Sequence, residues 1–364
     1  MANLKTGISS LGIHFPPLVM SVEELAKLRN IDPDKYLIGL GCKKIAMCPE
    51  DFSVVDLAAE AASRALARWK GNIKDIGLLA VGTESAVDMS RPLSAYVADR
   101  LGIYGNVRSY EVKHACYGGT LALRQAMEWK HSGMAPGKAA LIIATDISLY
   151  KPGDAGEPTQ GAGAVAFIID SPDIAEIDLI SYPWSRPVFD FWRPMEESFP
   201  LVDGNLSIES YKEAAIECFN ALLQDQNISL QQLFEQYHAC CFHSPFTKMV
   251  KKAFYAVCAN HGFDEQQSDA LFSEKVLPSM EWNALSGNSY TASLWVGVAK
   301  ALCGAAMGKK IAAFSYGSGC GAELLTLTAG EQAESCAWMD DVVTDFAKRK
   351  EITAEEYSVL RKVK

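Results

Sequence analysis

The chain has 364 residues, of which 49% are hydrophobic and 21% are charged, and its formal net charge at pH 7 is −10. This length suggests two domains or one large one, and the composition excludes a disordered chain and provides for a sizeable core. The acidic balance, without a basic tract or zinc-finger spacing, argues against a nucleic-acid partner and against an anionic membrane surface.

The N-terminal sequence and the cysteines predict a compartment. The first 17 residues, MANLKTGISSLGIHFPP, contain no hydrophobic signal core, and no run reaches the roughly 20 apolar residues of a membrane helix. The ten cysteines include no CxxC pair, so structural zinc and thioredoxin-like sites have little support. We therefore expect a cytoplasmic protein with reduced thiols.

In chain order, the first half alternates helical and strand patterns. Residues 21–30 begin with a capping box, and residues 53–69 form an Ala-rich amphipathic helix pattern. The apolar run IGLLAVGTES at 76–85 predicts a buried strand that ends in polar residues, and 92–102 predicts a helix that ends at glycine. Two more buried strands are expected, at 139–148 and 161–170.

The second half repeats this order. Its expected elements are a helix at 207–224, a strand at 235–246, a helix at 247–262, a turn and helix at 287–308, and a strand pair at 309–330. Strands that alternate with helices predict an α/β fold with a largely parallel sheet and helices on its faces. Because a glycine-rich strand pattern closes each half, we expect an internal duplication. The charged tail ends in a capped helix pattern at 352–364.

Four polar residues stand where apolar runs stop. They are Glu84, Cys116, His243 and Asn288. Sites in α/β sheets lie beyond the carboxyl ends of strands, so we expect these side chains to share a site. A thiol can form a thioester, a carboxylate or imidazole can move protons, and amide or imidazole donors can stabilise an oxyanion. The combination favours acyl transfer.

Cys116 follows a β-like run and precedes Gly118, Gly119 and a long helical pattern. The positive end of a helix lowers the pKa of a thiol, which favours a nucleophile at this place. Glycines beside it let a substrate or a backbone come close. A buried packing cysteine is the structural alternative.

Other candidates also have structural interpretations. Taken alone, Glu84 fits a solvated loop carboxylate and Asn288 fits a turn or cap residue. Lys248, Lys251 and Lys252 at the start of a predicted helix are either a solvated face or contacts to an anion such as a nucleotide phosphate, because cations there oppose the helix dipole.

The segment HACCFH raises a metal site as a rival for His243. Side chains alternate on a strand, so His238 and Cys240 would point one way and Cys241 and His243 the other. Four ligands cannot converge without breaking the strand. We therefore expect no metal and leave His243 free to reach the site.

Six motifs together resemble 3-hydroxy-3-methylglutaryl-CoA (HMG-CoA) synthases, in the bacterial form. In chain order they are EVKHACYGGT, GEPTQGAGAVAFII, FDFWRPMEESFPLVDGNLSIESY, FHSPFTKMVKKA, GNSYTAS and FSYGSGCGAEL, and the likeness runs from about residue 5 to 330. The resemblance implies a thiolase-like αβαβα sandwich of two similar halves, residues 1–170 with the nucleophile and base and residues 171–364 with the histidine, asparagine and lysines. It also implies a homodimer.

The resemblance implies a role for each site residue. Cys116 would be acetylated by acetyl-CoA, and Glu84 would take a proton from the acetyl methyl group. His243 would orient and polarise acetoacetyl-CoA, and Asn288 would hydrogen-bond it. Hydrolysis of the enzyme thioester would release HMG-CoA. The further positions that match the family's substrate site are Asp146, Tyr150, Asp190 and Ser318, with Lys248 and Lys252 beside CoA.

The resemblance also implies that the CoA thioesters are substrates and that no metal or organic cofactor is needed. Two related activities stay open. The motifs RPLSAYVADRLG and EVKHACYGGT also resemble polyketide β-branching synthases, which take acetoacetyl groups from an acyl carrier protein. A β-ketoacyl synthase III-like enzyme would use the same Cys, His and Asn but would not need Glu84. A non-catalytic scaffold is the remaining alternative, and the four intact residues argue against it.

Overall fold

The strands of both halves join in one ten-stranded sheet. In the computed structural model, which describes residues 5–134 and 136–362, the sheet has the order β12-β13-β14-β8-β1-β7-β6-β4-β5, and β9 pairs with β14. Its strands are β1 (Gly7–His14), β4 (Ile76–Gly82), β5 (Arg108–Val112), β6 (Ala139–Ser148), β7 (Gly161–Asp170), β8 (Ala175–Ile177), β9 (Tyr182–Ser185), β12 (Tyr237–Phe242), β13 (Lys310–Gly317) and β14 (Gly321–Ala329).

The expectation of a largely parallel sheet is wrong. Only β4–β5, β4–β6 and β12–β13 are parallel pairs, whereas β6–β7, β13–β14 and the pairs that join the two halves are antiparallel. The reason is connectivity: no α-helix separates β6 from β7 or β13 from β14, and a chain that returns without a crossover helix reverses direction.

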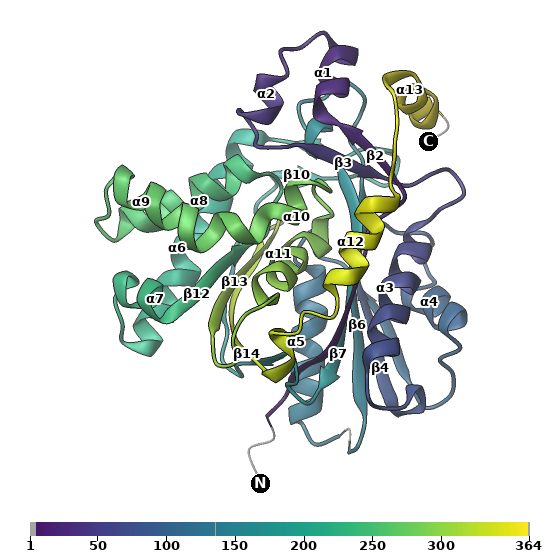
Figure 1. Cartoon of the computed structure of the whole chain (residues 1–364), viewed down its shortest axis with the longest axis vertical. Helices are drawn as coiled ribbons and strands as arrows, with labels where there is room; N and C mark the ends of the chain where they lie inside the picture. The colour runs from purple at the N-terminus through teal and green to yellow at the C-terminus, as the bar shows by residue number, and fades with distance from the viewer. Residues whose placement is uncertain (1–4, 135, 363–364) are drawn as a thin grey trace.

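Three layers of helices alternate with the two halves of this sheet, so the molecule has five layers (Figure 1). The middle layer is α5 (Gly118–His131) and α11 (Ser293–Leu302), whose apolar residues share one core with strands of both halves. The outer layers are α3 (Val54–Arg68) with α4 (Leu93–Leu101) on one side, and α6 (Gly204–Gln226) with α8 (Thr247–Asn260) on the other. This layering agrees with the αβαβα sandwich. The boundary between residues 170 and 171 stays a prediction.

The predicted helix ends are found where the capping residues stand. Ser53 and Asp56 form a capping box at the start of α3, and Gly102 ends α4 with a left-handed φ of 68°.

Strand register determines where the predicted site residues lie. Gly82 at the end of β4 lies opposite Val112 of β5 and Ala144 of β6. The segments that follow these strands therefore meet at one edge of the sheet.

A smaller layer with its own core covers this edge at the top of Figure 1. It combines N-terminal segments with the C-terminal tail, where the expected last helix is confirmed; residues 363–364 of that expectation lie outside the described residues. The elements of this layer are α1 (Val22–Arg29), α2 (Asp34–Leu37), β2 (Leu18–Ser21), β3 (Lys44–Met47), β15 (Lys350–Glu351) and α13 (Ala354–Lys362).

Shorter elements complete the chain. They are α7 (Leu230–Gln236), α9 (Glu265–Leu271), α10 (Glu281–Ala284), α12 (Met339–Lys348) and the hairpin β10 (Phe191–Trp192) with β11 (Leu201–Val202). Across the two described stretches, no helix combines the length and the apolar character needed to cross a membrane.

The expectation that all thiols are reduced is wrong for one pair. Cys303, just after α11, and Cys336, before α12, form a disulfide across 33 residues of sequence. The fold brings the two Cα atoms to 4.8 Å, a distance that a disulfide can span. The sequence did not predict the pair, because a separation of 33 residues matches no cysteine motif. The other eight cysteines are not in disulfides.

Candidate active site

Cys116 lies on a sharp turn just before α5. The preceding residue, Ala115, has a left-handed φ of 40°, which is rare for a residue with a side chain and is typical of functional sites. The glycines that follow serve the packing of the helix on the sheet. A Cβ on Gly119 would lie 2.6 Å from the Cβ of Ala144, and one on Gly118 would lie 2.9 Å from the carbonyl oxygen of Val112. They let backbone approach backbone, which is one of the two interpretations of the sequence.

Glu84 is the second residue after β4, and Asp146 of β6 fixes the turn that carries it. One carboxylate oxygen of Asp146 accepts hydrogen bonds from the backbone N–H groups of Glu84 and Ser85, both at 2.9 Å, and from the Thr83 hydroxyl at 2.8 Å. The other oxygen accepts from the N–H and hydroxyl of Thr291. Asp146 is fully buried, so its role is to hold Glu84 and the segment before α11 in place.

The Cys116 thiol donates a hydrogen bond to Oε1 of Glu84 over 3.4 Å. This contact confirms that the two strand ends bring thiol and carboxylate together. The expected lowering of the thiol pKa is not found. Burial and the neighbouring carboxyl groups of Glu84 and Asp146 raise the pKa of Cys116 well above its usual range, and burial with the Asp146 charge raises the pKa of Glu84 to about 8. Burial of the sulfur, together with the two acidic groups close to it, outweighs the effect of the helix terminus on the thiol pKa.

His243 directly follows β12, and its side chain is almost fully buried. Its backbone N–H donates to the carbonyl of Phe314, and its Nδ1 lies 2.7 Å from the hydroxyl oxygen of Ser293 at the start of α11. The same hydroxyl oxygen accepts the N–H of Ser244 at 3.2 Å. Burial lowers the pKa of His243 to about 3, so the imidazole is neutral at physiological pH. With Nδ1 engaged by Ser293, Nε2 is the atom available to a substrate.

Asn288 stands on the turn before α11, also buried. Its Oδ1 accepts the N–H of Tyr290 at 2.9 Å, and its own N–H donates to the carbonyl of Thr159. Because the oxygen is held by backbone, the Nδ2 group is the part of this amide that can donate to a ligand. The turn interpretation of Asn288 is thus correct for its oxygen and does not compete with a role for its nitrogen.

One cavity of about 560 Å³ brings five of the ten predicted residues together. Cys116, Tyr150, His243, Asn288 and Ser318 all line it. Its remaining walls are largely apolar and include Leu40, Phe191, Val202, Ile208, Phe246 and Met249. A mostly apolar pocket with a few convergent polar groups is the usual form of a small-molecule site. Glu84 does not line this cavity, although its carboxyl group reaches the thiol from the other side.

Asp190 and Ser318 form a pair at the wall of the cavity. The Ser318 hydroxyl donates to Oδ2 of Asp190 at 2.9 Å, and Tyr316 approaches the same oxygen at 3.4 Å. Asp190 is fully buried, and its carboxylate is among the groups that raise the pKa of Cys116. Asp190 therefore supports the site from behind, while Ser318 faces the cavity.

The predicted lysines lie beside the cavity and not in it. Lys248 and Lys252 are exposed on the first turns of α8, and the backbone N–H of Lys248 donates to the carbonyl of Leu40, which lines the cavity. Lys251 instead pairs with Asp269 at 2.7 Å.

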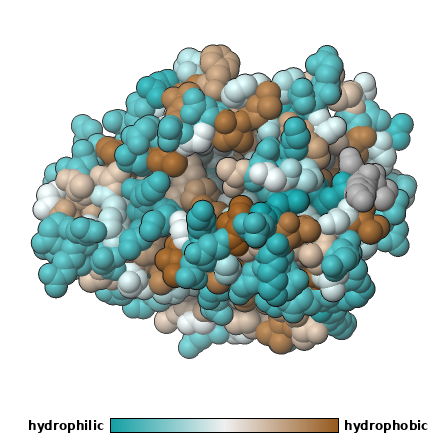
Figure 2. Space-filling model, turned by 90° about the horizontal axis from the view of Figure 1, so that it is seen from above, coloured by the Kyte–Doolittle hydropathy of each residue, from teal (hydrophilic) through white to brown (hydrophobic). Residues whose placement is uncertain are grey.

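Seen from above, the molecule mixes hydrophilic and hydrophobic residues, and apolar residues gather near the middle of this face (Figure 2).

The strand HACCFH behaves as alternation predicts. Cys240 packs in the outer core with α6 and α8, whereas Cys241 packs in the middle core with α11. Among the residues that the structure describes, no three His, Cys, Asp or Glu side chains gather as metal ligands.

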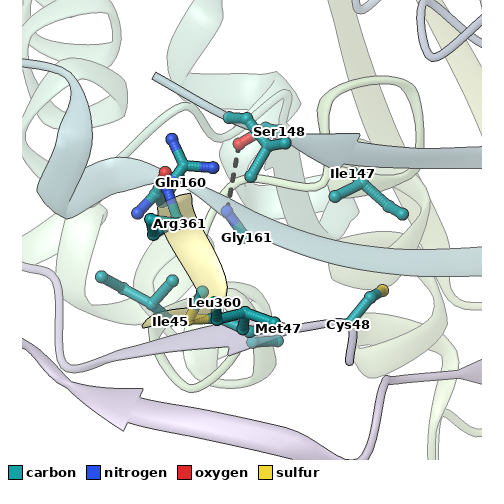
Figure 3. Close-up of a pocket in the computed structure, with 11 residues that line it drawn as sticks. Ile45, Met47, Cys48, Ile147, Ser148, Gln160, Gly161, Leu360 and Arg361 are labelled. Atoms are coloured by element: carbon teal, nitrogen blue, oxygen red, sulfur yellow. Dashed lines mark hydrogen bonds between the residues drawn. The ribbon is translucent and has the colours of Figure 1, made fainter. Parts of the chain in front are cut away.

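Sequence reasoning missed the contribution of the C-terminal helix. Tyr357 of α13 donates to Glu157 and accepts from Gln160, both at 2.7 Å, and Arg361 donates to the backbone carbonyl of Tyr150. Figure 3 shows Arg361 beside Gln160 in the small cavity between β3, β7 and α13. No motif announces these contacts, because they join residues about 200 positions apart. Ser293 and Thr291 were also missed, although both lie in the polar cluster after Asn288.

Two family models match the sequence of this chain. The N-terminal model of hydroxymethylglutaryl-coenzyme A synthases matches residues 3–174, and the C-terminal model matches residues 180–271 and 264–363. The hydroxymethylglutaryl-CoA synthase of Enterococcus faecalis is 37% identical over 333 residues, which cover 90% of this chain and 84% of the relative. The human cytoplasmic hydroxymethylglutaryl-CoA synthase is 29% identical over 94% of this chain and 75% of its own.

Solved structures show the same fold. MvaS in complex with 3-hydroxy-3-methylglutaryl coenzyme A has a TM-score of 0.92 at 35% identity, over 99% of this chain and 92% of its own. The HMG synthase of the curacin biosynthetic pathway, in complex with an acetyl donor acyl carrier protein, has a TM-score of 0.92 at 28% identity, over 98% of this chain and 88% of its own. PksG of Bacillus subtilis has a TM-score of 0.90 at 28% identity, over 99% and 88% of the two chains.

Proposed function

This chain belongs to the hydroxymethylglutaryl-CoA synthase family of acyl-transferring condensing enzymes with a thiolase fold, and from that premise we propose that it makes HMG-CoA from acetyl-CoA and acetoacetyl-CoA. The observation that carries the proposal is the contact of 3.4 Å between the Cys116 thiol and Glu84. Cys116 lines the same cavity as His243 and Asn288.

The first step transfers the acetyl group to the enzyme. The sulfur of Cys116, after loss of its proton, attacks the thioester carbonyl of acetyl-CoA and CoA leaves as the free thiol. The Cys116 side chain lines the cavity at the N-terminal end of α5, where backbone N–H groups and the helix dipole favour negative charge. These groups offset part of the cost of forming a thiolate near two carboxyl groups.

The second step forms the carbon–carbon bond. The Glu84 carboxylate removes a proton from the methyl group of acetyl-Cys116, and the resulting carbanion attacks the ketone of acetoacetyl-CoA. The alkoxide that forms takes the proton back from Glu84, which leaves Glu84 as a carboxylate for hydrolysis. His243 is neutral and presents Nε2, so it acts as a hydrogen-bond donor or acceptor and not as a cation. With the Nδ2 group of Asn288 it orients and polarises the acetoacetyl thioester. Hydrolysis of the bond to Cys116 then releases HMG-CoA.

Single-turnover labelling tests this proposal. Incubation with acetyl-CoA is expected to add one acetyl mass to the peptide that holds Cys116, and Cys116→Ser is expected to abolish it. A chase with acetoacetyl-CoA is expected to convert the label to HMG-CoA. A label on Cys240 or Cys241 would contradict the assignment of Cys116 as the nucleophile. We expect none there, because both thiols are buried and neither lines the cavity.

A carrier-protein substrate is the second candidate. The structure of the curacin synthase with an acetyl donor carrier protein supports it, since that enzyme has the same fold at 28% identity. Rates with free acetoacetyl-CoA and with acetoacetyl-acyl carrier protein, measured on one preparation, decide between the two carriers and between a mevalonate and a polyketide context. A β-ketoacyl synthase III-like activity is disfavoured, because it has no use for a carboxyl group against the thiol.

The proposal includes a homodimer in the cytoplasm that uses no cofactor beyond its CoA substrates. The family resemblance supports the dimer. Eight of the ten cysteines are free, as in a reducing compartment, whereas the Cys303–Cys336 disulfide is not typical of one. Light scattering of the purified protein tests the dimer. Activity after exhaustive chelation and gel filtration tests the absence of a cofactor.

A further inference from the structure

Glu84 opens into a second space, which Cys116 does not line. This cleft of about 350 Å³ lies behind the carboxyl group, between the start of α3, the segment after β4 and the loop that carries β10. Its polar lining consists of Glu50, Ser53, Glu84, Ser85, Arg193 and Ser198. We call it the rear cleft, and the cavity that Cys116 lines the acyl cavity.

A thin wall separates the two spaces. Phe191, Pro200 and Tyr290 line both the acyl cavity and the rear cleft. Cys116 lines the first space and Glu84 lines the second, and the hydrogen bond of 3.4 Å between the thiol and the carboxyl group connects the two residues. Each member of the catalytic pair therefore belongs to the wall of a different space.

The two spaces have different chemistry. The acyl cavity has largely apolar walls, and a bound acyl-CoA fills it and displaces its water. The rear cleft also has apolar lining residues, among them Phe52, Val87 and Leu149, but it adds hydroxyl groups and charged side chains of both signs, which hold water. Release of the product nevertheless consumes one water molecule at Cys116 while the CoA portion still occupies the acyl cavity.

We propose that the rear cleft supplies the hydrolytic water to Glu84 and carries the released proton away. This inference rests on the proposed function, because it assigns a route to its last step. Arg193 marks the route: its Nη2 donates to the backbone carbonyl of Glu84 at 3.0 Å, and its side chain is exposed at the mouth of the cleft.

The step balances as follows. Glu84 accepts a proton from water, and the water oxygen attacks the thioester carbonyl on Cys116. The carbon–sulfur bond breaks, and the departing thiolate of Cys116 takes a proton from Glu84. The net reaction consumes one water and gives the free thiol, a carboxylate and one proton, which passes to the water of the rear cleft. The product leaves through the acyl cavity with its CoA portion attached.

Narrowing the rear cleft tests the route. Ala86 lines the cleft and is exposed, so Ala86→Trp adds bulk there without touching the acyl cavity. Ser198→Trp is a second variant from the opposite wall. Met89→Trp is the matched control, since Met89 is 73% exposed and lies outside the lining. Labelled acetyl-enzyme is chased with acetoacetyl-CoA, so that the CoA portion occupies the acyl cavity, and release of the label from Cys116 is measured after rapid quenching.

We expect Ala86→Trp and Ser198→Trp to slow this hydrolysis at least about tenfold and to raise the acylated fraction at steady state, while the acetylation rate stays within about twofold. Met89→Trp is expected to match the parent. If both cleft variants release the label from Cys116 at the parent rate under this chase, the water enters elsewhere and the inference is overturned. If the parent itself is not acetylated on Cys116, the proposed function fails first, so the two failures are distinguishable.

Discussion

Cys116 and Glu84 form a hydrogen-bonded pair of acids, with Sγ 3.4 Å from Oε1. Both pKa values are raised, that of Glu84 to about 8, because burial and the nearby Asp146 charge disfavour the anions. The resting site at neutral pH therefore holds a thiol next to a carboxyl group that is mostly protonated. Catalysis requires each group to lose its proton at a different step, which separates the steps experimentally.

Glu84→Ala is expected to keep acetylation and lose condensation. Glu84 is one of the groups that raise the pKa of Cys116, after burial, so its removal does not disfavour the thiolate that acetylation needs. A thioester methyl is a very weak acid, and loss of its base is expected to slow condensation at least about 10²-fold. Labelling with acetyl-CoA followed by a chase with acetoacetyl-CoA separates the two rates. Condensation near the parent rate would reduce Glu84 to a loop carboxylate.

Condensation is expected to rise with pH up to about 8. Glu84 must be a carboxylate to accept the methyl proton, and below its pKa of about 8 the carboxylate fraction falls about tenfold per pH unit. The charge of Arg193 lowers the pKa of Glu84, so Arg193→Gln is expected to move the midpoint upward. Arg193→Lys keeps a cation and is the control. A midpoint that moves downward in Arg193→Gln contradicts this assignment.

The sequence predicted that Glu84 and Cys116 meet, because each follows a strand and the parallel neighbours β4 and β5 carry them to one edge. Their catalytic roles stay predictions. The sequence failed on the thiol pKa. Helix position can be inferred from local pattern, whereas the carboxyl group of Asp146, which lies 30 residues beyond Cys116, acts only through space. Strand direction was predicted wrongly because the alternation of strands and helices was extended to the whole sheet, although no helical pattern separates the strands that became β6 and β7, or β13 and β14.

Ser293→Ala is expected to impair His243 without affecting acetylation. The Ser293 hydroxyl holds Nδ1 of His243 at 2.7 Å and so determines which nitrogen faces the substrate. We expect kcat for condensation to fall about tenfold with a smaller change in the KM for acetyl-CoA. Ser293→Thr restores the hydroxyl and is expected to recover most of the activity. Equal losses in the two variants would indicate a packing defect.

Replacing Lys248 and Lys252 with Ala is expected to raise the KM for CoA substrates and to leave kcat nearly intact, the signature of lost uniform binding. Both side chains are exposed at the start of α8, beside Leu40 of the acyl cavity, where their charge can meet phosphate groups. Lys251→Ala is the matched control, since Lys251 is paired with Asp269. An unchanged KM in the double variant would indicate that the two lysines only form a solvated face of α8 and do not bind phosphate.

The C-terminal helix stabilises one wall of the acyl cavity. The Tyr357 hydroxyl is buried and joins Glu157 to Gln160, and Glu157 also binds Arg29 through two hydrogen bonds of 2.6 and 2.7 Å. The segment between β6 and β7 that contains Glu157 also supplies Tyr150, Gly156 and Thr159 to the cavity wall. Fixing Glu157 therefore fixes the shape of the substrate site.

Tyr357→Phe is expected to lower the free energy of unfolding by about 1–3 kcal/mol, because it leaves the buried Gln160 amide without its acceptor. It is also expected to raise the KM for acetyl-CoA, while the acetylation rate at saturating substrate changes little, because Cys116 and Glu84 lie on other elements. Denaturant unfolding and initial rates measure the two effects. Tyr104→Phe is the control, since Tyr104 is 70% exposed. Loss of stability with an unchanged KM would show that α13 supports the fold without shaping the site.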